Sequence, residues 1–469
     1  MKPWLLAFVL LQACSMAPKY ERLDAPVPSN YSTPASPVAL AGDGPRTNDE
    51  DLKNWKQHFT DPGMQRFIDA VLENNKELKI AALRVEELRA LYRIQRSEQL
   101  PSLGANGSLT RGKQFDYFAG APVTSSIYDA RVQLMAFELD FFGRVKSLSD
   151  AALNRYLGTE VAHRSVLISL VAQAASAYIA EISLGQQEKL ALETLSSRED
   201  TLKIDKSRFE KGISNALELK TSEMLVGTSR ASVAEVRRQR EINRNNLRIL
   251  AGRFDFTPEE STLLVDTIRF PDLQSGVPSE LLARRPDILS AEFALKAENA
   301  NIGAARAAFF PSISLTSHIG STSTDLDDLF KGSTETWSFI PTINIPIFYG
   351  GRNIANLDAA NVRKNVAVLQ YEQAIQNAFR EVRDALVGHQ LIDEQVAAQK
   401  SVRDADAERA RLAKSRYDRG VAGYLEYLDA QRSQFDSDLT YLKLHELRLS
   451  NDIALYRALG GGWDGTQGH

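Results

Sequence analysis

The residue best placed to do chemistry is Cys14, the single cysteine among 469 residues. It follows Lys2 and a short apolar stretch at 4–11, the order of a positive n-region and a hydrophobic h-region in a secretory signal. The segment around Cys14 resembles a lipoprotein processing site, although Gln12 is less usual there. A plain signal peptide and a buried free thiol are the alternatives. We therefore predict an exported chain acylated at Cys14.

Motifs for enzymatic or metal chemistry are missing from the sequence. It contains no Walker A loop, no His-Glu-x-x-His, no paired cysteines and no Gly-x-Ser-x-Gly. The six histidines are scattered along the chain: His58, His163, His318, His389, His445 and His469. We therefore expect no enzyme, no catalytic residues, no metal and no cofactor.

Charge and hydropathy argue against two further classes of protein. The formal net charge is -4, whereas a nucleic-acid partner calls for a basic surface or stripe. We find no run of about 18 apolar residues, which argues against a membrane-spanning helix. Membrane strands leave a much weaker, alternating signal, so a membrane location stays open.

The chain repeats itself at an offset of 208 to 210 residues. The segment 208–212 returns as 416–420, and Gly143-Arg144 returns as Gly351-Arg352. A weak similarity at a fixed period indicates one structural unit used twice.

Each copy predicts a long helix followed by a second helix that returns beside it. Residues 144–209 contain no proline, and at 1.5 Å per residue this stretch would be about 100 Å long. The returning helix is predicted at 216–250, and the second copy repeats the pair at 352–417 and 424–459. Seven residues alternate steps of four and three, as in a coiled-coil seam: Val161, Ser165, Ile168, Ala172, Ala175, Ile179 and Ile182.

A shorter helix precedes the strands of each copy. Asp61 and Pro62 have the residue types of an N-cap and a first helical turn. From there we predict one helix to about Glu98, with a counterpart from about Pro286 to Ala308.

After each shorter helix the hydrophobic period changes from 3.6 to 2, which predicts strands. Apolar and polar residues alternate at 128–134, 313–319 and 337–347. An ordinary half-buried antiparallel sheet alternates in the same way. Aromatic residues at the ends of the apolar faces, and long polar connections at 112–124 and 320–335, favour a lipid-facing barrel. Pro341 and Pro346 fit less well, because proline cannot donate to a ladder.

Two strands in each copy make four in one chain. Four strands cannot close into a barrel, and open sheet edges are not tolerated in lipid. We therefore predict an obligate oligomer that pools the strands of several chains.

Several segments together resemble the TolC-type outer membrane factors, in particular the OprM-like (NodT-type) outer-membrane efflux lipoproteins. They cover essentially the whole mature chain: Trp55 with 59–62, 142–144, 301–312, 424–432 and 455–463. The resemblance implies a mixed α/β membrane protein and a homotrimer. Its 12-stranded transmembrane β-barrel, with four strands per chain, would continue into a long periplasmic α-helical coiled-coil barrel. The expected location is the bacterial cell outer membrane, with a lipid anchor and a periplasmic projection.

The function that this resemblance implies is the exit duct of a tripartite multidrug or toxic-compound efflux system. The duct would be passive, gated at its periplasmic tip, and coupled through a periplasmic adaptor to an inner-membrane pump. That pump would be of the resistance-nodulation-division or the major-facilitator type. The exit duct of a protein-secretion system, and a lipid-anchored coiled-coil scaffold without a pore, are the alternatives.

The resemblance also assigns candidate working residues. The glycine turns after the long helices, Gly212 and Gly420, map to the periplasmic tip and the adaptor contact. Leu425 and Asp429 map to the inner gate, and Glu426 falls where some relatives carry a second gate carboxylate. A ring of carboxylates near a threefold axis would bind cations and set selectivity. Equally, carboxylates in a first helical turn stabilise the helix dipole, and glycine often ends a helix.

These predictions divide the chain into six parts. They are a signal peptide at 1–13, an acylated linker at 14–51, a first repeat at 52–258, an equatorial connector at 259–285, a second repeat at 286–462 and a C-terminal tail at 463–469.

Overall fold

The computed structural model describes residues 15–23, 25–28, 31, 55–118, 120–257, 263–271, 273 and 285–461. Cys14 and the predicted signal peptide lie outside the described residues, as do most of the linker and connector. The chain divides into two compact units. The first contains residues up to 24, 83–160 and 290–373, and the second contains 25–82, 161–289 and 374–469.

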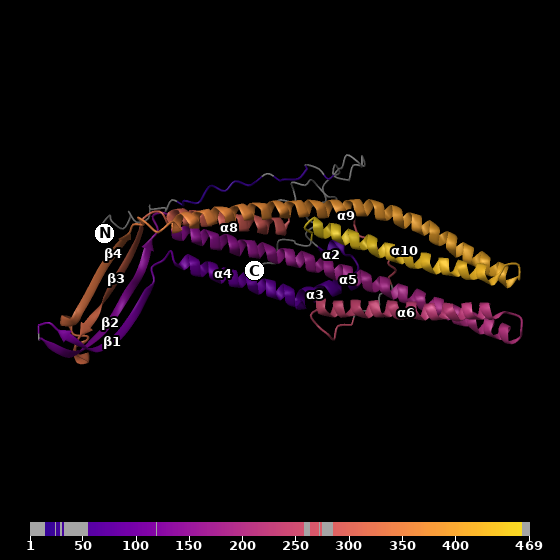
Figure 1. Cartoon of the computed structure of the whole chain (residues 1–469), viewed down its shortest axis with the longest axis horizontal. Helices are drawn as coiled ribbons and strands as arrows, with labels where there is room; N and C mark the ends of the chain where they lie inside the picture. Colours follow the sequence, from indigo (N-terminus) through magenta and orange to yellow (C-terminus); the bar gives the residue numbers. More distant parts are fainter. Residues whose placement is uncertain are drawn as a thin grey trace. The chain divides into compact units, whose positions relative to one another are not determined.

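The four strands of the first unit form one antiparallel sheet (Figure 1). They are β1 (Leu103–Asp116), β2 (Ala121–Leu139), β3 (Ser312–Ser323) and β4 (Glu335–Asn344), and neighbours in the sheet follow chain order. Each copy contributes two strands, as predicted. Within the described chain, β1 and β4 are therefore the two edges of the sheet.

The strand register gathers apolar residues on one face of this sheet. Val132 pairs with Ile319, which pairs with Trp337. Trp337 is 74% exposed and Phe339 is 61% exposed. The opposite face carries polar groups, including an ion pair between Asp129 and Arg131. This confirms the predicted alternation. Because soluble monomers rarely expose so many contiguous apolar side chains, the face requires an apolar environment.

The connections between paired strands are shorter than the sequence predicted. The β1–β2 ladder continues to the pair Asp116 and Ala121, so only 117–120 connect these strands. Residues 324–334 connect β3 to β4 and contain the short helices η3 (Leu326–Asp328) and η4 (Gly332–Thr334). The prediction was wrong because it used polar composition, whereas the backbone groups form a ladder whatever the side chains.

Two irregularities lie within the sheet. The β2–β3 register shifts between Leu134 and Phe137, and Ala136 has a φ of 39°. This is a β-bulge, which the alternation of residues cannot reveal because the bulge inserts extra residues. Pro341 lies in the edge strand β4, where proline is tolerated, and Pro346 follows the end of that strand.

Residues 15–23 lie along helix α8 (Pro286–Ala307) in the first unit. Asn299 donates to the carbonyl of Pro18 at 2.6 Å. Further along, Glu292 is 3% exposed and binds Tyr20 and Arg22. Burial opposes the ionisation of this carboxyl, but hydrogen bonds from Arg22 and Lys296 hold the pKa of Glu292 below its ordinary value. The segment that follows Cys14 is therefore held against its own chain.

Two long helical hairpins dominate the second unit (Figure 1). Helix α6 (Ala216–Leu250) folds back along α5 (Arg144–Glu210), and α10 (Tyr424–Ala458) folds back along α9 (Arg352–Asp418). Both α5 and α9 begin in the first unit and continue in the second. Their bounds agree with the predicted ones to within one residue. Most of the predicted seam is buried, including Ile168, Ala175 and Ile179.

One stretch of α5 is more apolar than the sequence analysis allowed. Among the described residues, an 18-residue window of this helix has a mean hydropathy of 1.5, enough to cross a membrane by length and composition. Polar residues interrupt this stretch, so it is no continuous apolar run, but by its mean hydropathy it passes a criterion that the search for such runs did not apply. However, 61% of the window is buried inside the fold, which is typical of a core helix.

The predicted helix from Pro62 to about Glu98 is in fact two helices. Helix α3 (Pro62–Asn74) ends at Asn75, and α4 (Lys76–Ser97) begins after it. Asp61 caps α3 as predicted, accepting from the Met64 amide at 2.7 Å. Asn75 has a ψ of 132°, its carboxamide oxygen accepts from Glu77 and Leu78, and its NH2 donates to Leu250. The break therefore depends on a tertiary contact to α6.

An aromatic cluster forms part of the core of the second unit. His58, in the short helix α2 (Trp55–His58), stacks on Tyr456 with ring centroids 4.5 Å apart. Phe59 and Phe270 pack against the imidazole ring of His58. Neither ring nitrogen of His58 has a hydrogen-bond partner among the described residues. Burial lowers the pKa of His58 to about 4 because the site cannot solvate a charged imidazole.

We expect this histidine to make stability pH-dependent. Between pH 6.5 and about pH 4 the unfolded chain binds a proton at this position that the folded chain does not. The stabilisation is therefore complete above pH 6.5 and is lost as the pH falls, by up to about 3 kcal/mol. His58→Phe keeps an aromatic ring and should flatten this part of the curve, measured by thermal unfolding in detergent at several pH values.

Phe59→Leu is the control, because it disturbs the same cluster without removing a titrating group. It should lower stability by the same amount at every pH. A pH slope that is unchanged in His58→Phe would contradict the assignment.

Candidate functional site at the hairpin turns

The two hairpin turns have the same backbone geometry. Gly212 and Gly420 have φ of 71° and 72°, a region that glycine adopts without strain. The amide of Ile213 donates to Arg208 at 2.9 Å, and the amide of Val421 donates to Arg416 at 3.0 Å. Together with the glycine amides these bonds form a Schellman motif at the end of each long helix. The positive φ expected at both glycines is present.

The helices that follow the turns begin differently. Asn215 caps α6 by accepting from the Glu218 amide at 3.0 Å, and the Glu218 carboxylate binds back to Ser214 and Asn215. This reciprocal arrangement resembles a capping box. Gly423 occupies the equivalent position before α10 and provides no side-chain cap. The start of α10 is therefore held by contacts other than a cap.

The three predicted gate residues lie within the first two turns of α10. Leu425 is 64% exposed. Glu426 forms an ion pair with Arg416 at 3.2 Å, and Asp429 forms one with Arg409. Both arginines belong to α9, so each carboxylate links α10 to the preceding helix. The two carboxylates were predicted from the sequence, whereas their arginine partners were not.

Three tyrosines hold the start of α10 against residues of α6 and α9. Tyr424, Tyr427 and Leu428 are buried beside Leu225, Ala410, Ala413 and Ala430. The ring of Tyr417 stacks on that of Tyr427, with centroids 5.6 Å apart. Burial raises the pKa of Tyr424, Tyr427 and Tyr417, so all three phenols are neutral.

Polar contacts join the first hairpin to the second. Ser222 of α6 donates to the carboxylate of Asp205 in α5 and shares a hydrogen bond with the hydroxyl of Tyr424. Asp205 is 3% exposed and Ser222 is 2% exposed. Nearby, Arg208 of α5 donates to the hydroxyl of Tyr417 in α9. Buried polar contacts of this kind are costly to break singly, because each partner is left desolvated. We call the contact between Ser222 and Tyr424 and the contact between Arg208 and Tyr417 the inter-hairpin link.

The asymmetry between the copies could have indicated this link from sequence. Tyr424 and Tyr427 stand where the first copy has Ala216 and Leu219, at the offset of 208. Only the second copy therefore brings phenol groups to the start of its returning helix. The partners Asp205 and Ser222 carry no comparable signal.

No group of three or more histidine, cysteine, aspartate or glutamate side chains in the described parts of the chain is arranged to hold a metal ion. The arrangement at the turns is therefore one of ion pairs, buried hydroxyls and an exposed leucine. Such groups can hold two helical hairpins together and release them, and they can bind passing ions.

Comparison with known proteins agrees with this architecture. The outer membrane efflux protein family matches residues 67–253 and 277–461. These two ranges begin 210 residues apart and end 208 residues apart, which is the offset of the repeated motifs.

Individual relatives match over nearly their whole length. The chain is 40% identical over 453 residues to the cation efflux system protein CusC of Escherichia coli O6:H1, covering 97% of this chain and 96% of CusC. It is 42% identical over 469 residues to the outer membrane protein OprJ of Pseudomonas aeruginosa, covering 98% of this chain and 95% of OprJ.

A solved structure gives the same result. The open state of the MtrE outer membrane channel of Neisseria gonorrhoeae superposes with a TM-score of 0.85 at 37% identity, covering 96% of this chain and 99% of MtrE. The family and its members are conduits for transport across the outer membrane. The chain therefore belongs to the outer membrane efflux protein family, and it is an efflux channel of the outer membrane.

Proposed function

We propose that three copies of this chain form the exit duct of a tripartite efflux system. The observation that carries the proposal is the four-stranded sheet, whose edge strands β1 and β4 each have a partner on one side only within the described chain. Its apolar face suits lipid, yet unpaired backbone groups in lipid cost several kcal/mol each. Pairing β4 of one copy with β1 of the next would remove all edges, and three copies would supply a 12-stranded barrel.

The helical hairpins would form the periplasmic part of the same duct. Three pairs of hairpins around one axis would enclose a long α-helical coiled-coil barrel. The predicted lipid on Cys14 would anchor each copy in the membrane, and the N-terminal residues along α8 would lead to it. The division into signal peptide 1–13, linker 14–51, connector 259–285 and two repeats at 52–258 and 286–462 remains part of this proposal.

The gate would lie at the hairpin turns. Leu425 and Asp429 are four residues apart, so they lie on one side of α10. In a trimer this side would face the axis, where three leucines would obstruct hydrated solutes and the carboxylates would attract cations. The net electric field at the gate would be modest, because each carboxylate has an arginine beside it. Asp429 pairs with Arg409, and Glu426 pairs with Arg416.

Opening would require one hairpin to move relative to the other. The inter-hairpin link opposes this movement, because the contacts of Tyr424 and Tyr417 are made only when the hairpins pack together. The glycine turns at Gly212 and Gly420 would contact a periplasmic adaptor. They are surrounded by open space and flanked by the exposed side chains of Ile213 and Val421. An inner-membrane pump of the resistance-nodulation-division or the major-facilitator type would supply the energy.

The duct itself would be passive, with substrate choice made mainly by the pump. Relatives of similar identity support this, since CusC is named for cations whereas SrpC of Pseudomonas putida, 41% identical, is named for solvents. The efflux names of the relatives also favour this role over a protein-secretion duct or a scaffold without a pore.

The assembly prediction is tested by mass. The full chain, purified from the membrane fraction in mild detergent, should have the mass of three chains by light scattering after subtraction of the detergent. A monomer that conducts ions in a planar bilayer would contradict the pooled barrel.

The gate prediction is tested by removing both carboxylates. Asp429→Ala with Glu426→Ala should raise single-channel conductance and shift selectivity from cations toward anions, because Arg409 and Arg416 keep their charges. The control is Glu408→Ala with Asp418→Ala, which removes two exposed carboxylates paired within α9. Unchanged conductance and selectivity in the first double variant would exclude these residues from the gate.

The inter-hairpin link is tested by removing one hydroxyl. Tyr424→Phe should favour the open state by about 1 kcal/mol per chain, or about fivefold in the equilibrium. Open probability in planar bilayers measures this. Tyr427→Phe is the control, because among the described residues its hydroxyl bonds only to Gln431 of the same helix, at 2.5 Å. Equal open probabilities for the two variants would show that the link does not hold the closed state.

A further inference from the structure

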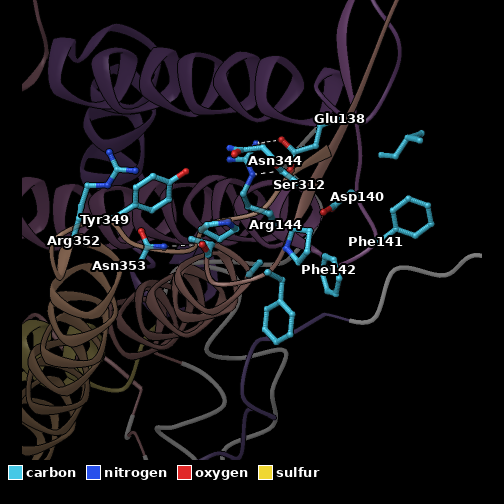
Figure 2. Close-up of a pocket in the computed structure, with 16 residues that line it drawn as sticks. Glu138, Asp140, Phe141, Phe142, Arg144, Ser312, Asn344, Tyr349, Arg352 and Asn353 are labelled. Atoms are coloured by element: carbon cyan, nitrogen blue, oxygen red, sulfur yellow. Dashed lines mark hydrogen bonds and ion pairs between the residues drawn. The ribbon is translucent and has the colours of Figure 1, made fainter. Parts of the chain in front are cut away.

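A second polar site lies in the first unit, where the strands meet the long helices. A cavity of about 280 Å³ opens between the end of β2, the connection from α8 to β3, and the segment from β4 to α9. Figure 2 shows its lining, with Arg144 bonded to Glu138 and with Arg352 beside Tyr349. This site is far along the chain from the candidate gate and takes no part in it.

The duplication makes Arg352 the counterpart of Arg144, but their surroundings differ. Arg144 donates two hydrogen bonds to Glu138, at 2.8 and 2.5 Å. At the offset of 208, Pro346 stands where the first copy has Glu138. Arg352 consequently has no carboxylate partner among the described residues. Its guanidinium lies over the ring of Tyr349, 4.6 Å from the centroid, a contact that orients the cation without neutralising it.

The carboxylates of this cavity are already bound. Glu138 is held by Arg144, and Asp140 accepts from the backbone amide of Lys146 at 2.7 Å. Neither carboxylate forms an ion pair with Arg352 among the described residues. The lining holds two carboxylates and two guanidiniums, and the guanidinium of Arg352 is the one that no carboxylate of this lining pairs. A guanidinium with its forked donors matches a phosphate group well.

Two exposed apolar side chains flank the lining in sequence, and we call them the apolar rim. Ile347 is 92% exposed and Phe348 is 85% exposed, and they stand between Pro346 and Tyr349, which both line the cavity. On the opposite wall Phe142 stacks on Phe310, with centroids 4.8 Å apart. An open cation beside exposed apolar side chains fits an amphiphile with an anionic head. Free phosphate would use the cation but would leave the apolar rim in water.

We propose that this cavity binds the phosphate of a membrane phospholipid through Arg352, with the acyl chains along Ile347 and Phe348. The inference rests on the proposed function, since it places the strand–helix junction at the periplasmic surface of the outer membrane, where phospholipid headgroups lie. One site per chain would give three in the assembled duct. The bound lipids would fix the height of the sheet in the bilayer at the point where the helices leave it.

The test is lipid binding to the delipidated full chain in detergent, followed by native mass spectrometry. The probes are dioleoylphosphatidylglycerol, dioleoylglycerol without a phosphate head, and inorganic phosphate. We expect the phospholipid to bind once per chain, and Arg352→Gln to weaken it about tenfold, which is the loss of one charge-assisted contact. Pro346→Glu should weaken it similarly, because a carboxylate at this position restores the pairing of the first copy.

Arg363→Gln is the matched control, since it removes an exposed charge from the same helix, and its lipid binding should equal that of the wild type. Equal binding to Arg352→Gln and to the wild type would overturn the proposal. So would equal binding of dioleoylglycerol, or displacement of the lipid by millimolar phosphate, which would indicate a simple anion site.

Conductance separates this proposal from the proposed function. Arg352→Gln should conduct like the wild type in planar bilayers, and loss of lipid binding with conduction intact supports the site. Loss of both would make Arg352 a structural residue and overturn it. A wild-type chain that binds lipid but does not conduct would contradict the exit duct and support the lipid site.

Discussion

A sheet edge exposed in lipid is the constraint on which this structure depends. One chain supplies four strands in the order β1-β2-β3-β4, with an apolar face and two edges that its own described residues do not pair. In water such edges bind solvent, but the bilayer core offers no donor or acceptor. The proposal that further copies close the sheet therefore follows from backbone hydrogen bonding, whereas the number of three copies comes from the family resemblance.

The two helical hairpins share the backbone of the duplicated unit but differ in their side chains. Their turns repeat one backbone solution, with Gly212 and Gly420 at nearly equal positive φ. Their side chains do not repeat. The second copy replaces a capping box with tyrosines that pack against the first hairpin, and it exposes Leu425 beside two paired carboxylates. A similar divergence at the junction with the sheet leaves Arg352 without the carboxylate that Arg144 has. In both places, function is proposed where the copies differ.

Much of the fold could be predicted from sequence because it depends on local patterns. Absence of proline, heptad spacing and residue alternation predicted the four long helices to within one residue and the two-faced strands. The failures have physical reasons. Asn75 ends α3 through a bond to Leu250, which lies 175 positions away. The ladder of β1 and β2 extends through polar residues because backbone groups form it. The apolar window in α5 forms no continuous run, because polar residues such as Ser169 and Gln173 interrupt the apolar residues of this helix.

The sequence by itself determined the periodicity, the glycine turns and the Asp61 cap. These are properties of neighbouring residues, so the printed chain contains them. The candidate positions Leu425, Glu426 and Asp429 came from the family resemblance and remain a prediction. Only the tertiary structure decided that Asp429 pairs with Arg409, that Tyr424 meets Ser222, and that Arg352 lies over Tyr349 in an open cavity. Such contacts depend on how helices rotate and pack against one another. That rotation is decided by the sum of many small contacts along the helices, which no local pattern encodes.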